Sequence, residues 1–426
     1  MSNICGAMVA WLTGVGALLL VGQSAHAGGE VWVARASGTE LVRLDAAGNT
    51  LVAATLPGSV FGVAVEGTGA AWAARTDVPV VHRVGLDGTL SSIEVGAVVR
   101  SLAVGADGSV WAVRPALADV VRFDPTGAIL GVYPVGPVPY GIAIDVLGQV
   151  WVTNTYGASV TRIDPVSGQT VDFAVDLFPT GIAAHGDGSV WVVSKESVQR
   201  LSPTGSVIFS ATAGWHSRGV AVDADGQVWV TNELSSDVHR FASDGSGLGV
   251  VTVGQRPWGI AARGAGGVYV LCSLGDGIWS LGPNGDLDGV IVADAPHAFG
   301  DLTGLARAAI VDPNGDADAD GHSNAFELEH DFDPLAADSM PVLFLRGDCD
   351  ANGAVGLADG VQILGYLFES APVACLEAAD VNDDGCVTLL DAVSLFGFLA
   401  QGGTPPPAPF PTAGYDPAPR DGLACP

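Results

Sequence analysis

Oxygen-bearing side chains recur at alternate positions in three short segments of the C-terminal part of the chain. The segments are 316–327 (DADADGHSNAFE), 348–359 (DCDANGAVGLAD) and 380–391 (DVNDDGCVTLLD). Each has Asp or Asn at positions 1, 3 and 5, glycine at position 6 and a carboxylate at position 12. Calcium takes six to eight hard oxygen ligands, which this spacing wraps around one ion, and the glycine permits the sharp turn. The sequence therefore predicts three calcium loops.

The predicted ligands are side-chain oxygens together with the backbone carbonyl of the residue at position 7. In the first loop they are Asp316, Asp318, Asp320, His322 (carbonyl), Asn324 and Glu327. In the second they are Asp348, Asp350, Asn352, Ala354 (carbonyl) and Asp359. In the third they are Asp380, Asn382, Asp384, Cys386 (carbonyl) and Asp391. The alternative is that these segments are solvated acidic loops that bind no ion.

The chain around these loops is strongly acidic, since residues 312–426 contain 20 acidic residues and two arginines. Without bound cations such a segment repels itself. Calcium is therefore expected to act here as a folding ligand rather than as a regulator.

The second and third loops begin two copies of one unit, offset by 32 residues. The match continues past the loops, where GVQILGYL at 360–367 aligns with AVSLFGFL at 392–399. Apolar residues at i, i+3 and i+4 after each position 12 predict an amphipathic helix behind each loop. Asp rather than Glu at position 12 distinguishes both loops from those of ordinary EF-hands.

Over residues 346–400 this double loop–helix motif resembles a type I dockerin. The resemblance implies a domain that folds around calcium and docks through a helix face onto a cohesin-like domain. Positions 10 and 11, which would contact that partner, are Leu357, Ala358, Leu389 and Leu390; many dockerins have Ser or Thr there. Alternatively, the partner is another domain of the same chain, or Leu389 and Leu390 are core residues. The loop at 316–327 resembles the thrombospondin type 3-like calcium repeats that join domains in secreted proteins.

A repeat of about forty residues fills the chain before these loops. Its aromatic residues are Trp32, Trp72, Trp111, Trp151, Trp191, Trp229 and Tyr269. Each one after Trp32 follows a short apolar strand and an Asp-Gly or related turn, as in PYGIAIDVLGQVWVTNTYGASVTRID at 139–164. This period with short strands predicts blades of a β-propeller, one four-stranded sheet per period. The first blade lacks its own first strand, and we expect Gly304–Leu305–Ala306 to complete it and close a seven-bladed ring.

The repeat resembles NHL-type propellers and, more closely, virginiamycin B lyase-like propellers over nearly all of 28–310. In the lyases a catalytic His precedes the Gly that opens a blade, and a Glu follows the aromatic strand. In this chain the corresponding residues are Phe61, Tyr140, Thr180, Arg218, Trp258 and Thr303, with Arg100 before Ser101. None is His, and VLCS after the seventh aromatic strand contains no Glu. The lyase chemistry is therefore not expected to carry over, and no catalytic residue is assigned.

Two other sets of residues in the propeller could do chemistry. His216 and Glu233 fall in one blade and could form an acid–base pair; the alternative is that both are loop residues without a joint role. Tyr140, Trp215 and Trp258 could line a ligand-binding mouth, or they could pack between blades.

The composition and the N-terminal segment limit the classes of partner and the cellular location. The 426 residues carry 46 acidic and 17 basic side chains, a formal charge of −29, which argues against nucleic acid and anionic membranes as partners. An apolar stretch at 8–21 and the Ala25–His26–Ala27 pattern predict a signal peptide over 1–27, hence export. Cys349, Cys375, Cys386 and Cys425 could form two disulfides, leaving Cys272 as a buried thiol.

The sequence thus predicts a mainly β protein with a small C-terminal α-helical calcium-loop domain. The expected parts are a signal peptide (1–27), a seven-bladed propeller (28–310), a calcium loop with linker (311–345) and a dockerin-like domain with a Pro-rich tail (346–426). The expected function is that of a secreted, calcium-binding modular protein. Its non-catalytic propeller would bind a glycan or protein, and its C-terminal module would attach to a cohesin-like domain or cell-surface scaffold. The alternatives are a dockerin-borne carbohydrate-active enzyme of polysaccharide breakdown and a propeller lyase.

Overall fold

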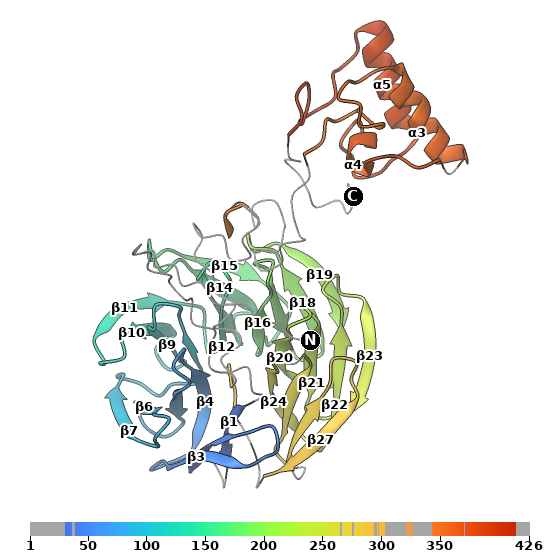
Figure 1. Cartoon of the computed structure of the whole chain (residues 1–426). Coiled ribbons are helices and arrows are strands. Elements are labelled where there is room, and N and C mark those ends of the chain that lie inside the picture. Colours follow the sequence, from blue (N-terminus) through green and yellow to red (C-terminus); the bar gives the residue numbers. More distant parts are fainter. Residues whose placement is uncertain are drawn as a thin grey trace, which may run out of the picture.

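The structure is a computed structural model, and it describes residues 30–35, 39–264, 266–274, 277–293, 296, 298–302, 322–324, 326, 343–369 and 371–414. The described strands form seven antiparallel sheets around a central axis, and the described helices lie in a separate C-terminal unit (Figure 1). The prediction of a mainly β, seven-bladed propeller is confirmed.

The sheets follow one another along the chain, each running from the axis outward in sequence order. Blade 1 contains β1 (Val31–Arg35), β2 (Glu40–Leu44) and β3 (Thr50–Thr55). Blade 2 contains β4 (Val60–Val65), β5 (Ala71–Arg75), β6 (Val80–Val84) and β7 (Leu90–Glu94). Blade 3 contains β8 (Leu102–Val104), β9 (Val110–Arg114), β10 (Asp119–Phe123) and β11 (Ile129–Pro134). Blade 4 contains β12 (Pro139–Ile144), β13 (Val150–Asn154), β14 (Ser159–Ile163) and β15 (Thr170–Ala174).

The last three blades repeat this order. Blade 5 contains β16 (Ile182–Ala184), β17 (Val190–Val193), β18 (Ser197–Leu201) and β19 (Val207–Thr212). Blade 6 contains β20 (Ser217–Val222), β21 (Val228–Asn232), β22 (Asp237–Phe241) and β23 (Gly247–Thr252). Blade 7 contains β24 (Pro257–Ala262), β25 (Val268–Cys272), β26 (Gly277–Leu281) and β27 (Leu287–Val292).

The repeated aromatic residue is the centre of each blade. It stands on β1 in blade 1 and on the second strand of the other six blades, and it is almost completely buried in all seven. An arginine lies over the ring in five blades, with its guanidinium carbon 4.6–5.7 Å from the ring centroid. The pairs are Arg122–Trp111, Arg162–Trp151, Arg200–Trp191, Arg240–Trp229 and Arg263–Tyr269. These cation–π contacts indicate that these five arginines contribute to the packing of their blades.

The ring closes through residues 298–302. The backbone N–H of Trp32 on β1 donates to the carbonyl of Leu302, so this segment lies against β1 where a first strand would lie. On its other side, Phe299 pairs with Gly62 of β4 in a parallel bridge. Closure therefore joins the two ends of the propeller as expected, but through a segment a few residues before Gly304. Residues 304–306 themselves lie outside the described part of the chain.

The C-terminal unit contains α3 (Leu357–Glu369), the short α4 (Leu376–Ala379) and α5 (Leu389–Gln401). Helices α3 and α5 pack together around a core that includes Ile363 and Leu395. Helix α5 begins with a capping box between Thr388 and Asp391, and Gly402 ends it in a left-handed conformation. None of the described helices is long and apolar enough to cross a membrane.

The described part of the Pro-rich tail belongs to this unit. Arg346 is completely buried, and its Nε donates to the carbonyl of Ala408 at 3.0 Å. Its Nη1 donates to the carbonyl of Asp380 at 2.8 Å, at the start of the segment 380–391. One side chain thus ties together the beginning, middle and end of the unit.

The prediction of two disulfides in the C-terminal part is wrong. Cys375 is disulfide-bonded, but Cys349 and Cys386 carry free thiols. Cys349 is buried in the core of the unit, whereas Cys386 is exposed in the last loop. Cys272 is a buried free thiol on β25, as predicted.

The buried carboxyl of Asp145 gives the propeller a specific pH dependence. It accepts hydrogen bonds from the indole N–H of Trp151 and from two backbone N–H groups, yet burial raises its pKa to about 6. As pH rises from about 4 to 6, the unfolded chain releases this proton before the folded chain does, so the folded state loses stability. We expect Asp145→Asn to remove that loss, which is on the order of 3 kcal/mol for a shift of about two pKa units.

The measurement is urea unfolding between pH 4 and 7, followed by tryptophan fluorescence, because all ten tryptophans precede residue 280. The difference in unfolding free energy between the variant and the wild type should grow in the variant's favour with pH. Asp124→Asn is the control. Hydrogen bonds, the largest effect being that of Thr126, lower the pKa of this exposed carboxyl. The variant should therefore lose stability relative to the wild type as pH rises, the opposite of Asp145→Asn. A difference that does not change with pH would contradict the assignment.

Candidate functional site

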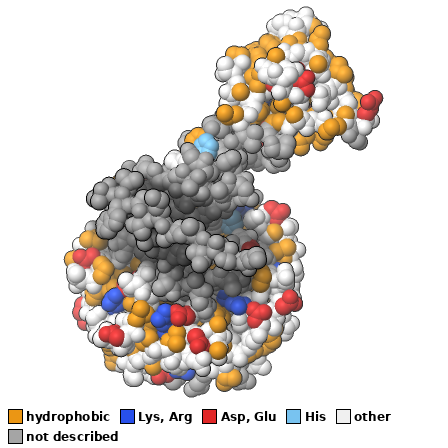
Figure 2. Space-filling view, viewed as in Figure 1, with side chains coloured by type: hydrophobic (Ala, Val, Ile, Leu, Met, Phe, Trp, Pro, Cys, Tyr) orange, Lys and Arg blue, Asp and Glu red, His pale blue; other side chains and the backbone are white. Residues whose placement is uncertain are grey.

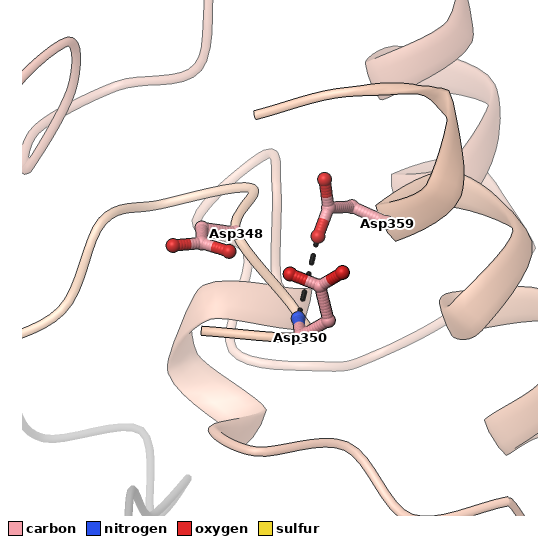
Figure 3. A group of neighbouring side chains, drawn as sticks. All are labelled: Asp348, Asp350 and Asp359. Atoms are coloured by element: carbon pink, nitrogen blue, oxygen red, sulfur yellow. Dashed lines mark hydrogen bonds between the residues drawn. The ribbon is translucent and has the colours of Figure 1, made fainter. Parts of the chain in front are cut away.

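Three carboxylates converge in the first loop of the C-terminal unit. Oxygen atoms of Asp348, Asp350 and Asp359 all lie within 4.8 Å of one another. Figure 3 shows the three side chains gathered around one point, with Asp359 reaching in from the first turn of α3. Two of the three residues are buried, and Asp350 is exposed. Hard divalent cations prefer such a set of oxygen ligands.

The backbone of the loop holds these carboxylates in place. Asp348 accepts hydrogen bonds from the N–H groups of Asn352 at 3.0 Å and Gly353 at 2.8 Å. Asp359 accepts from Cys349 and from Gly356, both at 2.8 Å. Gly353 has φ 87°, which a residue with a side chain adopts at a cost. The glycine at position 6 therefore permits the sharp turn that the sequence predicted, and this turn brings positions 1 and 12 of the loop close together.

The second loop repeats these contacts 32 residues later. Asp380 accepts from the N–H groups of Asp384 at 3.2 Å and Gly385 at 2.8 Å, and Asp391 accepts from Thr388 at 2.7 Å. The two helices behind the loops have the same length and the same offset. The two halves of the unit are therefore structural as well as sequence duplicates.

The remaining predicted ligands differ between the loops. Asn352 and Asp384, at position 5, each accept a hydrogen bond from the backbone N–H two residues on, which belongs to Ala354 and Cys386. Asn382 stands at position 3 where the first loop has Asp350, and its side chain donates to Asp384 at 2.9 Å. The second loop thus brings fewer carboxylates to positions 1, 3 and 12. Burial raises the pKa values of Asp348 and Asp391, so an ion-free loop disfavours their charged forms.

The predicted loop at 316–327 is described only in part. Asn324 is buried, and the ring of His322 stacks on that of Phe326 with centroids 5.0 Å apart. Asp316, Asp318, Asp320 and Glu327 lie outside the described residues, so this loop stays a prediction.

The four predicted partner-binding residues all lie on the surface. Leu357, Leu389 and Leu390 are 62%, 52% and 55% exposed, and Ala358 is exposed as well. The alternative that Leu389 and Leu390 are core residues is therefore wrong. Val361 and Val393, one helical turn further on, are 62% and 56% exposed and extend the same surface along both helices. In Figure 2 apolar side chains cover much of the visible face of this unit.

In the propeller, the residues that precede the first-strand glycines meet across the axis. Phe61 of blade 2 makes edge contacts with Tyr140 of blade 4 and Trp258 of blade 7, with ring centroids 6.1 Å apart in each case. Phe299 stacks on Phe61 at 6.0 Å, and the guanidinium of Arg100 lies 4.0 Å above the Phe61 ring. Tyr140 and Trp258 are thus packing residues, whereas Trp215 is 62% exposed.

Beside this aromatic cluster, the Glu233 carboxylate contacts two arginines and a histidine from blades 6 and 7. Its carboxylate accepts from Nε of Arg218 and Nε of Arg256, both at 2.9 Å, and lies 2.9 Å from Nδ1 of His216. Glu233 is 2% exposed. Burial raises its pKa, but the hydrogen bonds from Arg256, Arg218 and His216 outweigh burial and hold the pKa below its usual value.

An acid–base pair of His216 and Glu233 was one of the two alternatives that the sequence left open, and the structure brings the two side chains together. The sequence did not single out Arg256. The one available signal was that Arg218 and Arg256 fall outside the repeat position at which other arginines stack on tryptophan. Glu233 is held ionised by two arginines, which suits it to organise cations rather than to transfer protons.

The chain matches no protein-family model and no curated protein. Among solved structures it is similar to virginiamycin B lyase from Staphylococcus aureus, with a TM-score of 0.51 and 20% identity over 57% of this chain and 89% of the lyase. A streptogramin B lyase gives 0.52 and 17% identity over 63% and 91%. A functionally unknown protein from Desulfotomaculum acetoxidans gives 0.53 and 13% identity over 63% and 99%. These similarities define the fold as a virginiamycin B lyase-like seven-bladed propeller.

Removing the charge of Glu233 should destabilise the propeller. Glu233→Gln leaves two guanidinium groups next to a neutral amide in a largely buried setting, and we expect the unfolding free energy to fall by about 3 kcal/mol. Urea unfolding monitored by tryptophan fluorescence measures this loss. The control is Glu196→Gln, which removes an exposed carboxylate 3.9 Å from Lys195 and should change stability by less than about 1 kcal/mol. Equal effects of the two variants would contradict a structural role for the cluster.

Proposed function

We propose that this chain is a calcium-binding modular protein of the secreted type. Its propeller binds a ligand without catalysing a reaction, and its C-terminal unit is a dockerin-like module that attaches the propeller to a cohesin-like partner. The observation that carries this proposal is the duplication of the loop–helix unit, because the same carboxylate contacts recur with an offset of 32 residues. A solvated acidic loop has no need of such a repeated arrangement.

Calcium fits the residues that are present. In the first loop it would be held by Asp348, Asp350 and Asp359 with Asn352 and the carbonyl of Ala354, and in the second by the residues at the same positions. When bound, the ion supplies the positive charge that the converging carboxylates lack. Since Asp359 and Asp391 lie in the first turns of α3 and α5, ion binding would couple each loop to its helix.

The interior of the propeller favours binding over catalysis. Phe61, Tyr140 and Phe299 occupy the axis in rings 5.4–6.1 Å apart, so apolar packing stands where a polar reaction centre would need space. The His216–Glu233 contact is the feature that favours the enzyme alternatives. Two arginines on the same carboxylate weaken that case, because they stabilise its ionised form throughout the neutral pH range.

Export completes the proposal. The segment 1–27 lies outside the described residues, and its signal-peptide pattern supports delivery out of the cytoplasm. Millimolar calcium outside cells suits loops of this kind, whose affinities in extracellular modules are typically modest.

Calorimetric titration of the full chain with calcium tests the metal sites. We expect uptake of about three ions, one for each predicted loop, and loss of about one ion in Asp348→Ala, because position 1 contributes a buried carboxylate. Glu369→Gln is the control, since it removes one exposed charge from the same unit outside the loops. Absence of heat at millimolar calcium would overturn the calcium assignment and leave the propeller unaffected.

Binding to isolated cohesin domains, measured by surface plasmon resonance, tests the attachment role. Binding should require calcium and should fall at least tenfold in the double variant Leu357→Asp/Leu389→Asp, because both leucines are exposed at corresponding positions of the two helices. Leu343→Asp, equally exposed but before the first loop, should have little effect. If none of a diverse set of cohesins binds the calcium-loaded chain, the dockerin-like role is wrong.

A further inference from the structure

The left-handed backbone at two loop positions beside Glu233 does not require a polar residue. His216 and Arg256 occupy equivalent loop positions in blades 6 and 7, where the backbone is left-handed with φ of 64° and 53°. The same position with the same backbone holds Val138 in blade 4 and Phe178 in blade 5. Because apolar residues satisfy the fold at this position, the polar side chains of His216 and Arg256 need another explanation.

The cluster carries more positive than negative charge. Two guanidinium groups face the single carboxylate of Glu233, although the chain as a whole has a formal charge of −29. A guanidinium has five N–H groups. Arg256 uses its Nε and Nη2 on Glu233 while 44% of its side chain stays exposed. The buried carboxylate of Glu233 therefore orients the Arg256 guanidinium, while part of the Arg256 side chain remains exposed to solvent.

Exposed apolar side chains flank the cluster. Trp215 precedes His216 and is 62% exposed, and Leu234 follows Glu233 and is 53% exposed. A backbone hydrogen bond from Leu234 to the Trp215 carbonyl, 3.2 Å long, joins their two loops. On the inner side, the guanidinium of Arg218 lies 4.9 Å from the ring centroid of Trp258. An exposed aromatic ring, Trp215, is thus next in sequence to His216, on a loop whose backbone is hydrogen-bonded to the loop that carries Glu233.

We propose that this cluster, formed by Trp215, His216, Arg218, Glu233 and Arg256, binds a carboxylate-bearing sugar of an acidic glycan. Arg256, supported by Arg218, receives the carboxylate, and Trp215 offers an apolar face to the sugar ring. One uncompensated positive charge matches one monoanionic group better than a phosphate dianion. The idea rests on the proposed function only in its statement that the propeller binds a ligand, and it is independent of the calcium module.

The test is calorimetric titration of the full chain with trigalacturonate and with the neutral galactose trimer of the same linkage. Both titrations are made in EDTA and, separately, in calcium. We expect the acidic trimer to bind in both conditions and the neutral trimer to bind at least tenfold more weakly. Arg256→Gln should weaken binding of the acidic trimer at least tenfold, Arg256→Lys should have an intermediate effect, and Trp215→Ala should weaken it several-fold.

Lys195→Gln is the matched control, because it removes one exposed positive charge from blade 5 and should leave affinity within twofold. Urea unfolding by tryptophan fluorescence confirms that each variant is folded, and Trp215→Ala alters an exposed side chain in case Arg256→Gln does not fold. Equal affinity for the acidic and neutral trimers would overturn the carboxylate assignment while leaving glycan binding intact. Absence of binding, tighter binding of an acidic peptide, or insensitivity to Arg256→Gln would overturn the site. None of these results depends on calcium uptake.

Discussion

The close approach of neighbouring inner strands is the constraint on which the propeller depends. A Cβ atom built at Gly141 would lie 2.3 Å from the carbonyl oxygen of Thr180, and one at Gly259 would lie 2.2 Å from that of Ala298. Only glycine allows the strands to meet at this distance. The residue before each such glycine is thereby delivered to the mouth of the axis, whatever its chemistry.

This arrangement separates the residues that build the ring from those that give it a function. Buried tryptophans and the arginines stacked on them recur from blade to blade and hold each sheet together. The mouth positions are free to vary. In this chain they hold an aromatic cluster that includes Phe61 and Trp258, and beside it Arg218, which contacts Glu233. The C-terminal unit shows the same separation of roles. Its duplicated loops and helices carry the carboxylates, whereas Arg346 stabilises the unit through hydrogen bonds to backbone carbonyls.

The parts of the molecule that were predicted well are those governed by local periodicity. The forty-residue spacing of tryptophans led directly to blades, and the alternation of acidic residues around Gly353 and Gly385 led to turns of the expected kind. The closing segment was placed a few residues too late, because Phe299 stands where other blades have glycine or serine and hides the match. The expected pair of disulfides failed because Cys349 packs in a core that no local pattern reveals.

The sequence by itself determined the seven-bladed ring, the duplication in the C-terminal unit and the candidate ligands of its loops, since each of these follows from short-range repeats. Only the tertiary structure decided which side chains meet from different blades. Arg256 reaches Glu233 across 23 residues of chain, and Phe61 meets Trp258 across the axis. Such contacts depend on the closure of the ring, which brings together residues that are far apart in the sequence. A short stretch of sequence therefore cannot predict them.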